Sequence, residues 1–452
     1  MAEKRPNIIL FMTDDQGYGD LSCMGATDFC TPNLDRVAGM GVRFTDWYSN
    51  CPVCSPSRAS LLTGRYPGNA GVRSILAGHR TASGLLPEVP TLAEALGKLG
   101  YQTAMFGKWH LGLAEGCRPE EHGFEEWYGF MAGCVDYYSH IFYWGMSGGF
   151  DPVHDLWKNG EEVYDNGKYL TEVITDKAVA YIREAAQSDQ PFFLYLPYNA
   201  PHYPMHAPKK YVDRFPHLSP DRRIMAAMLS ALDDGVGDIV DELTRQGVLD
   251  DTFIFYQSDN GPSRESRNWL DGTPDPYYGG SAGALKGHKF SLYEGGIRMP
   301  ALMSWPARIP GGQVISEPGA AMDIFPTCLK IAGGDPSAYE LDGQDVLPMV
   351  AEGAPSPHEA IYWEMNDQTA VRRGDWKLVL DGVLVEGAPV EDAVHLSSLA
   401  EDMGERENLA EANPELTAEL KAAAEAWRAG IERRWTNEWQ PRLNGTTTHP
   451  EK

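Results

Sequence analysis

The chain has 452 residues, enough for up to about three domains of average size. Hydrophobic residues make up 42% and aromatic residues 11%, which excludes a wholly disordered protein. No run of about 18 apolar residues occurs, which excludes a typical transmembrane helix. The net charge of −26 argues against nucleic acid or an anionic membrane surface as a partner. An anionic substrate would therefore need a local basic pocket.

Four short apolar runs are predicted to be buried strands of a mostly parallel sheet. They span residues 8–12, 103–106, 192–196 and 252–256. Helical patterns lie between them: Thr91 and Glu94 form a capping box, and residues 175–186 and 225–243 are amphipathic. This alternation predicts an α/β fold, with a large mixed, mostly parallel sheet flanked by helices.

The composition changes near residue 345. Three short strands are predicted beyond that point, at residues 361–363, 369–372 and 376–380. A helix is expected after Asn413, with Pro414 in its first turn. We therefore divide the chain into a large domain, residues 1–354, and a smaller C-terminal α+β subdomain with a short antiparallel sheet, residues 355–452.

Each of the four main strands leads into polar side chains that can carry chemistry. In chain order these are Asp14 and Asp15, then Lys108 and His110, then His202, and finally Asp259 and Asn260. In an open α/β sheet, ligands bind beyond the carboxyl ends of the strands. We therefore expect these side chains to share one crevice.

Hard oxygen ligands stand out in this set. The carboxylates of Asp14, Asp15 and Asp259 and the amide of Asn260 suit Ca²⁺ or Mg²⁺ better than zinc, which prefers His and Cys. Taken singly, the first pair could cap a helix, and Asn-Gly is a common turn. Taken together at two strand ends, the four residues favour a metal site.

Cys54 is expected just before a helix that Pro56 opens and Gly64 closes. A helix N-terminus favours an anion and lowers the pKa of a thiol, and Arg58, about one turn further on, can point to the same place. An ordinary buried cysteine is the alternative, and spacing alone does not exclude it.

The seven cysteines are scattered and odd in number, which argues against a disulfide framework and is typical of a reducing compartment. Only five apolar residues, 8–12, follow the charged start, too few for the core of a signal peptide. We therefore expect a cytoplasmic protein as the sequence stands, or a secreted or periplasmic one if a leader has been removed.

Segments along most of the chain resemble type I sulfatases, a family of the alkaline phosphatase-like superfamily. The signature-like run is Cys54-Ser55-Pro56-Ser57-Arg58, followed by Leu62-Thr63-Gly64. Further matching segments lie at residues 7–19, 107–112, 201–204, 258–261, 289–298 and 369–378. The resemblance implies the alkaline phosphatase-like fold and hydrolysis of sulfate esters.

In that family a maturase oxidises the signature cysteine, which here is Cys54, to formylglycine, and the aldehyde hydrates to a gem-diol. One hydroxyl attacks sulfur and the alcohol or phenol leaves; the second hydroxyl then expels sulfate from the covalent sulfated enzyme. The resemblance implies one Ca²⁺ ion, which the gem-diol binds together with four side chains. Those side chains are Asp14, Asp15, Asp259 and Asn260.

The resemblance also assigns roles to five basic residues. Arg58 and Lys108 would hold the hydrated aldehyde, and His110 would take a proton from its second hydroxyl. His202 and Lys289 would bind sulfate oxygens and assist the departing oxygen. A sulfate monoester spreads one negative charge over three free oxygens, so it needs such a concentration of cations.

The match is weaker over residues 133–140, where Cys134 stands in a position that some relatives fill with Ser, and no sulfate contact is carried over to it. Aromatic side chains with a few polar groups suit a sugar ring or a flat aromatic, although a solvated loop is the alternative for each residue. The candidates for substrate specificity are Asp136, Tyr137, His140, Arg264, Arg267 and Trp269.

The first functional hypothesis is a sulfatase acting on an aryl, steroid or carbohydrate sulfate. The second is a phosphonate or phosphate ester hydrolase of the same superfamily. The third is a catalytically silent protein that binds sulfated ligands. The expected partners are a small-molecule or oligosaccharide sulfate ester and the maturase acting on Cys54, with no nucleic acid and no membrane.

Overall fold

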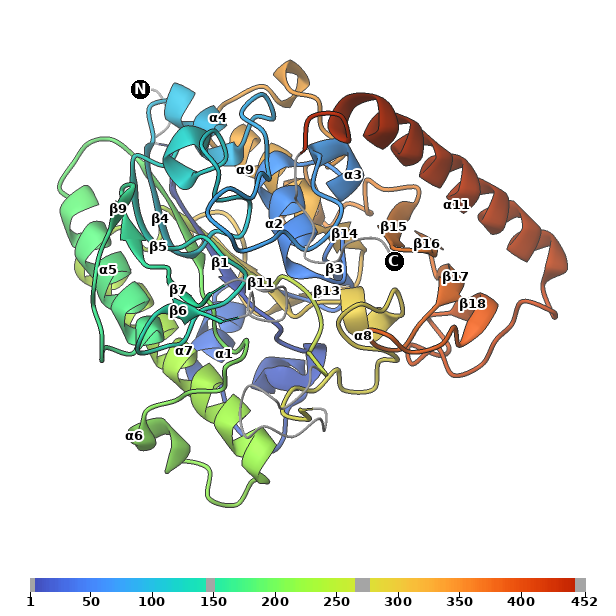
Figure 1. Ribbon diagram of the computed structural model, residues 1–452, viewed down its shortest axis with the longest axis horizontal. Coiled ribbons are helices and arrows are strands. Elements are labelled where there is room, and N and C mark those ends of the chain that lie inside the picture. The colour runs from blue at the N-terminus through green and yellow to red at the C-terminus, as the bar shows by residue number, and fades with distance from the viewer. Residues whose placement is uncertain (1–4, 144–150, 265–276, 444–452) are drawn as a thin grey trace.

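A large twisted sheet forms the centre of the molecule in the computed structural model, which describes residues 5–143, 151–264 and 277–443. Among these residues the sheet has ten strands in the order β13-β2-β12-β11-β1-β10-β4-β5-β8-β9 (Figure 1). In chain order the strands are β1 (Asn7–Thr13), β2 (Val42–Phe44), β4 (Gln102–Lys108), β5 (Glu126–Phe130), β8 (Trp157–Lys158), β9 (Glu161–Glu162), β10 (Phe192–Pro197), β11 (Thr252–Ser258), β12 (Ala301–Ser304) and β13 (Gln313–Ile315).

The middle of this sheet is parallel and its margins are mixed. Strands β11, β1, β10, β4 and β5 run parallel to one another. Strand β12 pairs antiparallel with both β11 and β2, and β8 pairs antiparallel with β5 and β9. The four predicted strands are β1, β4, β10 and β11, so the fold class expected from the sequence is confirmed.

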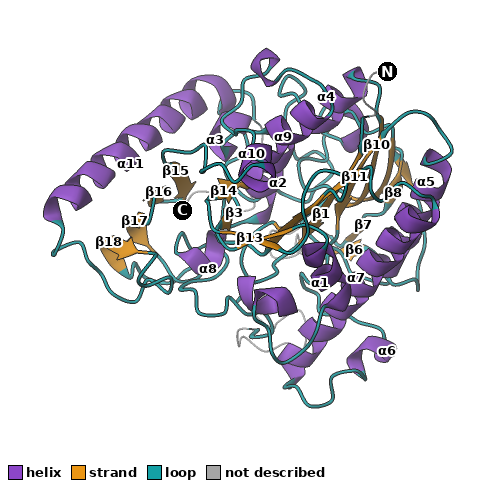
Figure 2. Ribbon diagram, turned by 180° about the vertical axis from the view of Figure 1, so that it is seen from behind, coloured by secondary structure: helices purple, strands orange, loops and turns teal. Residues whose placement is uncertain are grey.

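Helices cover both faces of the sheet (Figure 2). The helices that cover the sheet or lie near it are α1 (Pro32–Gly39), α2 (Cys54–Thr63), α3 (Pro67–Ala70), α4 (Leu92–Lys98), α5 (Leu170–Ala185), α6 (Lys209–Val212), α7 (Pro220–Arg245), α8 (Glu294–Ile297), α9 (Ile324–Ile331) and α10 (Leu347–Ala351). None of the helices within the described ranges has the length and apolar character that crossing a membrane requires.

The central strand β1 explains why the parallel strands read as unbroken apolar runs. Ile9 and Phe11 pack in one core with α1, α5 and α7. Ile8 and Leu10 point to the opposite face and pack with α2, α4 and α9. Successive side chains alternate between the two faces of a strand, and both faces here are buried under helices.

The C-terminal strands form a separate antiparallel sheet in the order β15-β16-β17-β18. Their bounds are Ile361–Met365, Gln368–Arg373, Trp376–Gly382 and Asp392–Ser398. The long helix α11 (Pro414–Arg434) lies along this sheet and buries Leu420 and Ala424 against it (Figure 1). The strand β18 was not predicted, because its first half carries exposed or half-exposed residues and gives no apolar run. The described part of the chain also contains two small two-stranded sheets. One pairs β3 (Trp47–Tyr48) with β14 (Gly319–Ala320), and the other pairs β6 (Ile141–Phe142) with β7 (Val153–His154).

A buried ionic cluster joins the C-terminal sheet to the main domain. The ammonium group of Lys377, on β17, lies 2.8 Å from the carboxylate of Glu294 and 3.0 Å from that of Glu405. Nearby, Arg372 on β16 lies 2.6 Å from Asp46, which is also paired with Arg298 at 2.6 Å. Burial opposes the charge on Glu294, but Lys377, Arg298 and Arg372 lower its pKa to about 2.

Replacing Lys377 with Met should destabilise the protein strongly, because two buried carboxylates would lose their shared cation. We expect a loss of about 3–5 kcal/mol in the free energy of unfolding, measured from the midpoint of urea denaturation. Lys421→Met on the exposed face of α11 is the control and should change it by less than about 0.5 kcal/mol. Equal effects of the two substitutions would show that the cluster does not hold the sheets together.

Candidate functional site

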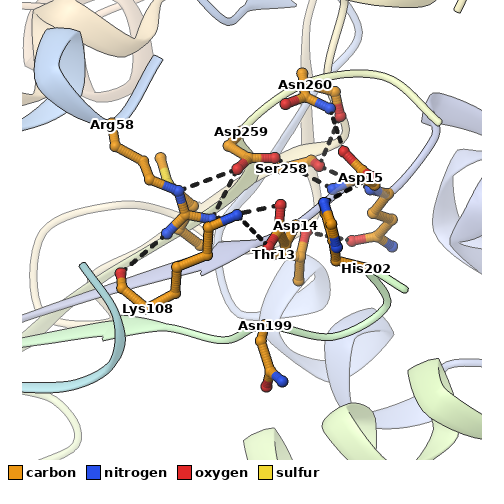
Figure 3. Close-up of polar contacts among 12 residues, drawn as sticks. Thr13, Asp14, Asp15, Arg58, Lys108, Asn199, His202, Ser258, Asp259 and Asn260 are labelled. Carbon is orange, nitrogen blue, oxygen red and sulfur yellow. Dashed lines mark hydrogen bonds and ion pairs between the residues drawn. The ribbon is translucent and has the colours of Figure 1, made fainter. Parts of the chain in front are cut away.

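Four oxygen-bearing side chains gather where two parallel strands end. Strands β1 and β11 are neighbours with Thr13 opposite Ser258, so the residues that follow each strand lie side by side (Figure 3). All four are almost fully buried. They are Asp14 and Asp15 after β1 and Asp259 and Asn260 after β11.

Direct hydrogen bonds tie the two strand ends together. The backbone N–H of Asp15 donates to Oδ1 of Asp259 at 3.2 Å, and the side-chain amide of Asn260 donates to Oδ1 of Asp15 at 2.6 Å. Asp15 has a φ of 64°, a left-handed conformation that Asp adopts more readily than most residues. This turn directs its carboxylate toward the residues after β11.

Each of the three carboxylates is paired with at least one cation, and Asp14 also lies 3.7 Å from Arg58. Arg58, one turn into α2, donates to Oδ2 of Asp259 from Nε at 3.1 Å and from Nη2 at 2.7 Å. Lys108, at the end of β4, donates to Oδ2 of Asp14 at 2.7 Å. The ammonium group of Lys289 lies 3.0 Å from the Asp15 carboxylate.

These pairs set the protonation states of the site. Burial favours a neutral Asp15, but Lys289 and His202 outweigh it and lower the pKa of this carboxyl. Burial and the neighbouring Asp14 raise the pKa of Asp259 to about 6. Burial likewise opposes the charge of Lys108, but Asp14 dominates and raises its pKa. The site therefore keeps Lys108 charged at neutral pH.

His202 has a defined tautomer. Its Nδ1 lies 2.7 Å from the carbonyl oxygen of Tyr203, and since a carbonyl only accepts, Nδ1 carries the hydrogen. Its Nε2 lies 3.3 Å from Nζ of Lys289 and 3.5 Å from Oδ2 of Asp15. The loop after β10 therefore brings His202 directly onto the carboxylate cluster.

His110 is the second histidine of the site. Its Nε2 lies 3.2 Å from the carbonyl oxygen of Leu76, so Nε2 carries the hydrogen and Nδ1 keeps a lone pair. Burial, together with the charges of Lys108 and Arg58, holds its pKa well below the ordinary value. His110 is therefore neutral at neutral pH, with a lone pair on Nδ1 that none of the described residues shares.

The thiol of Cys54 does not have the lowered pKa expected from its place in the sequence. The sequence predicts that Cys54 lies just before the helix α2. In the structure Cys54 is the first residue of this helix, and Val53 is its N-cap. Burial raises the pKa of the thiol, and Lys108 and Lys289 only partly oppose this effect. Desolvation thus outweighs the helix N-terminus, and the unmodified thiol is not an activated nucleophile at neutral pH.

The oxygen cluster fits a divalent cation. Oδ1 of Asp14 and Oδ1 of Asn260 are buried and accept no hydrogen bond from the described residues. Asp14, Asp15 and His202 each offer one ligand atom, and these atoms lie within 4.8 Å of one another. Carboxylate and amide oxygens are the ligands that Ca²⁺ prefers. His202, expected from the sequence as a sulfate ligand, also lies within reach of an ion.

The predicted specificity residues differ in position. Tyr137 is fully buried, and its hydroxyl donates to the carbonyl oxygens of Asn199 at 2.7 Å and His202 at 2.9 Å, so it supports the His202 loop. His140 is also fully buried. Asp136 accepts hydrogen bonds from the backbone of the turn that follows it, and its Oδ2 lies 3.2 Å from Nδ1 of His206. Arg264 is half-buried, and Arg267 and Trp269 lie outside the described residues.

Sequence reasoning assigned no role to two supporting residues. The hydroxyl of Ser55 accepts a hydrogen bond from the backbone of Leu76 at 3.1 Å and so fixes the loop that holds His110. Asn199 is buried, its side chain points away from the carboxylates in Figure 3, and its amide has no hydrogen-bond partner among the described residues. Only its position directly after β10 could have drawn attention to it.

Comparisons with known proteins agree on one family. The family model described as Sulfatase matches residues 6–334. N-acetylgalactosamine-6-sulfatase of Mus musculus is 35% identical over 83% of this chain and 72% of its own, and arylsulfatase A of Homo sapiens is 33% identical over 92% and 86%. The crystal structure of Ps i-CgsB with k-i-k-neocarrahexaose superposes with a TM-score of 0.84 at 32% identity, covering 98% of this chain and 96% of that one.

Calcium binding should depend on the carboxylates after β1. After chelator treatment, the protein should bind Ca²⁺ in a calorimetric titration, and Asp14→Asn should weaken binding at least about tenfold because the ion loses a charged ligand. Asp241→Asn, an exposed carboxylate on α7, is the matched control and should leave the affinity unchanged. Unaltered binding by Asp14→Asn would place the ion elsewhere.

Proposed function

The chain belongs to the sulfatase family and is a sulfuric ester hydrolase, and we propose that it acts through a formylglycine made from Cys54 with one bound Ca²⁺ ion. The observation that carries this proposal is the position of Cys54. It is buried at the start of α2, where the charges of Lys108, Lys289, Asp14 and Asp259 all act on it. A modifying maturase is the partner that this chemistry requires.

The ion would be held by Asp14, Asp15, Asp259 and Asn260. When bound, it would polarise a sulfate oxygen, and the hydrated aldehyde at position 54 would supply the attacking oxygen and carry the sulfated-enzyme intermediate. The buried setting strengthens each of these interactions, because the effective dielectric constant there is low.

The side chains of the site divide the remaining work. Arg58 and Lys108 are fully buried and stay charged, so they orient the hydrated aldehyde and balance its developing negative charge. Lys289 binds the sulfate group and gives a proton to the departing alcohol oxygen, with His202 beside it. His110 then accepts a proton at Nδ1 from the second hydroxyl as sulfate leaves.

We infer that the substrate is a carbohydrate sulfate, with aryl sulfates as simpler substitutes. One similar enzyme is named for N-acetylgalactosamine, and one similar structure holds k-i-k-neocarrahexaose. A phosphonate or phosphate ester hydrolase is the competing activity. Turnover of sulfate, phosphate and phosphonate esters of one leaving group separates the two, and a preference for either phosphorus ester would reject our assignment.

Modification of Cys54 can be read directly by mass. In protein produced with a maturase, the tryptic peptide of residues 44–58 should be lighter than the unmodified peptide by about 18 Da, as expected when a thiol becomes an aldehyde. The Cys54→Ala protein should show no such change and no ester hydrolysis. An unmodified thiol in an active wild-type enzyme would refute the proposed nucleophile.

Lys289 should be essential, and its neighbour Lys286 should not. Lys289→Gln removes the cation next to Asp15 and should lower kcat/KM for 4-nitrophenyl sulfate by about 10²–10³-fold. Lys286→Gln is the matched control, since Lys286 lies beside Tyr293 and 3.7 Å from Glu391, and it should change kcat/KM less than about twofold. The reverse order of effects would transfer the catalytic role to Lys286.

A further inference from the structure

We propose that Arg264 forms a second anion subsite beside the reaction centre. Its ligand is a carboxylate or an additional sulfate on the same substrate molecule as the reacting ester. The inference rests on the proposed function and narrows the substrate to a carbohydrate that carries at least two anionic groups.

The backbone places Arg264 close to the segment that carries Lys289. Arg264 follows Asn260 by four residues, and the carbonyl oxygen of Pro262 accepts a hydrogen bond from the N–H of Lys289 at 3.1 Å. Two residues span at most about 7 Å, so the Cα of Arg264 lies within that distance of Pro262. Burial and, after it, the charge of Arg264 lower the pKa of His288, the residue before Lys289.

The guanidinium group of Arg264 contacts only neutral groups among the described residues. Nη1 donates to the carbonyl oxygens of Ser263 at 3.1 Å and Gly280 at 3.2 Å, and Nη2 donates to Gly280 at 3.2 Å. Its central carbon lies 5.4 Å from the centre of the Tyr278 ring. The Tyr278 side chain is 61% exposed, so this arginine–tyrosine pair lies at the protein surface.

Five other arginines with substantial burial have carboxylate partners. Each lies within 3.1 Å of at least one Asp or Glu oxygen; they are Arg58, Arg73, Arg222, Arg298 and Arg372. The nearby carboxylate of Asp20 is already bound by Arg222 and by the backbone of Ser281. In a chain of net charge −26, Arg264 thus keeps its capacity for an external anion.

The surroundings also suit a sugar. An exposed tyrosine ring offers an apolar face next to a charged donor, the combination that binds a pyranose bearing an acidic group. A guanidinium fork can bind a carboxylate or a sulfate in bidentate fashion, so both sources of the anion share one recognition chemistry. The experiment distinguishes them.

Binding is measured without turnover in a Cys54→Ala background, which also makes the result independent of the proposed chemistry. The ligands are a disaccharide with one sulfate ester and one uronic carboxylate, its methyl ester, and a disaccharide with a second sulfate in place of the carboxylate. Each is titrated into the Cys54→Ala protein and into the Cys54→Ala, Arg264→Gln protein.

With Arg264 present, the free acid or the disulfate should bind about tenfold more tightly than the methyl ester, and Arg264→Gln should remove most of this difference. If Arg264→Gln weakens binding of the free acid, the anion that Arg264 recognises is a carboxylate. If it weakens binding of the disulfate, that anion is a sulfate. Arg223→Gln is the matched control, because Arg223 on α7 also donates to two carbonyl oxygens, and it should show no coupling.

Absence of binding by all three ligands overturns the subsite, and so does an equal effect of Arg264→Gln on each of them. Failure of the proposed function is recognised separately. In that case the wild-type protein, with position 54 converted to the aldehyde, would hydrolyse neither 4-nitrophenyl sulfate nor the sulfated disaccharide.

Discussion

Burial of three carboxylates at the ends of two adjacent strands is the constraint on which the site depends. Taking a charge out of water costs several kcal/mol per ion unless a partner compensates it. Asp14, Asp15 and Asp259 therefore require Lys108, Lys289 and Arg58, which come from β4, the loop before α8, and α2. The need to neutralise the carboxylates thus fixes the positions of three residues to which the proposed function assigns roles in the reaction.

The C-terminal sheet takes part in the same arrangement. Lys377 on β17 holds Glu294, which begins the short helix α8, only five residues after Lys289. Glu405 accepts a hydrogen bond from the backbone N–H of Glu294 at 2.6 Å. The segment from Lys289 to Glu294 is therefore held at both ends, by Asp15 in the site and by the buried ionic cluster around Lys377.

An acidic protein acting on an anionic ester has to concentrate cations locally. Arg58, Lys108 and Lys289 are balanced by carboxylates of the site, so in the proposed function the ion and the substrate would meet a set of groups whose charges nearly cancel. Arg264 differs because its neighbours are carbonyl groups and an aromatic ring. In the proposed function, this contrast would separate the residues that organise the reaction from one that selects the substrate.

The sequence alone determined the parallel strands, the polar residues at their ends and the family signature around Cys54, because each of these is a local pattern of a few consecutive residues. It did not reveal strand β18, the tautomers of His110 and His202, the raised pKa of Cys54 or the buried cluster around Lys377. These depend on packing between distant segments: Asp15 and Lys289, for example, are 274 positions apart. Tertiary structure alone decided which cation faces which carboxylate, because burial and distance set those energies and neither leaves a periodic signal in the chain.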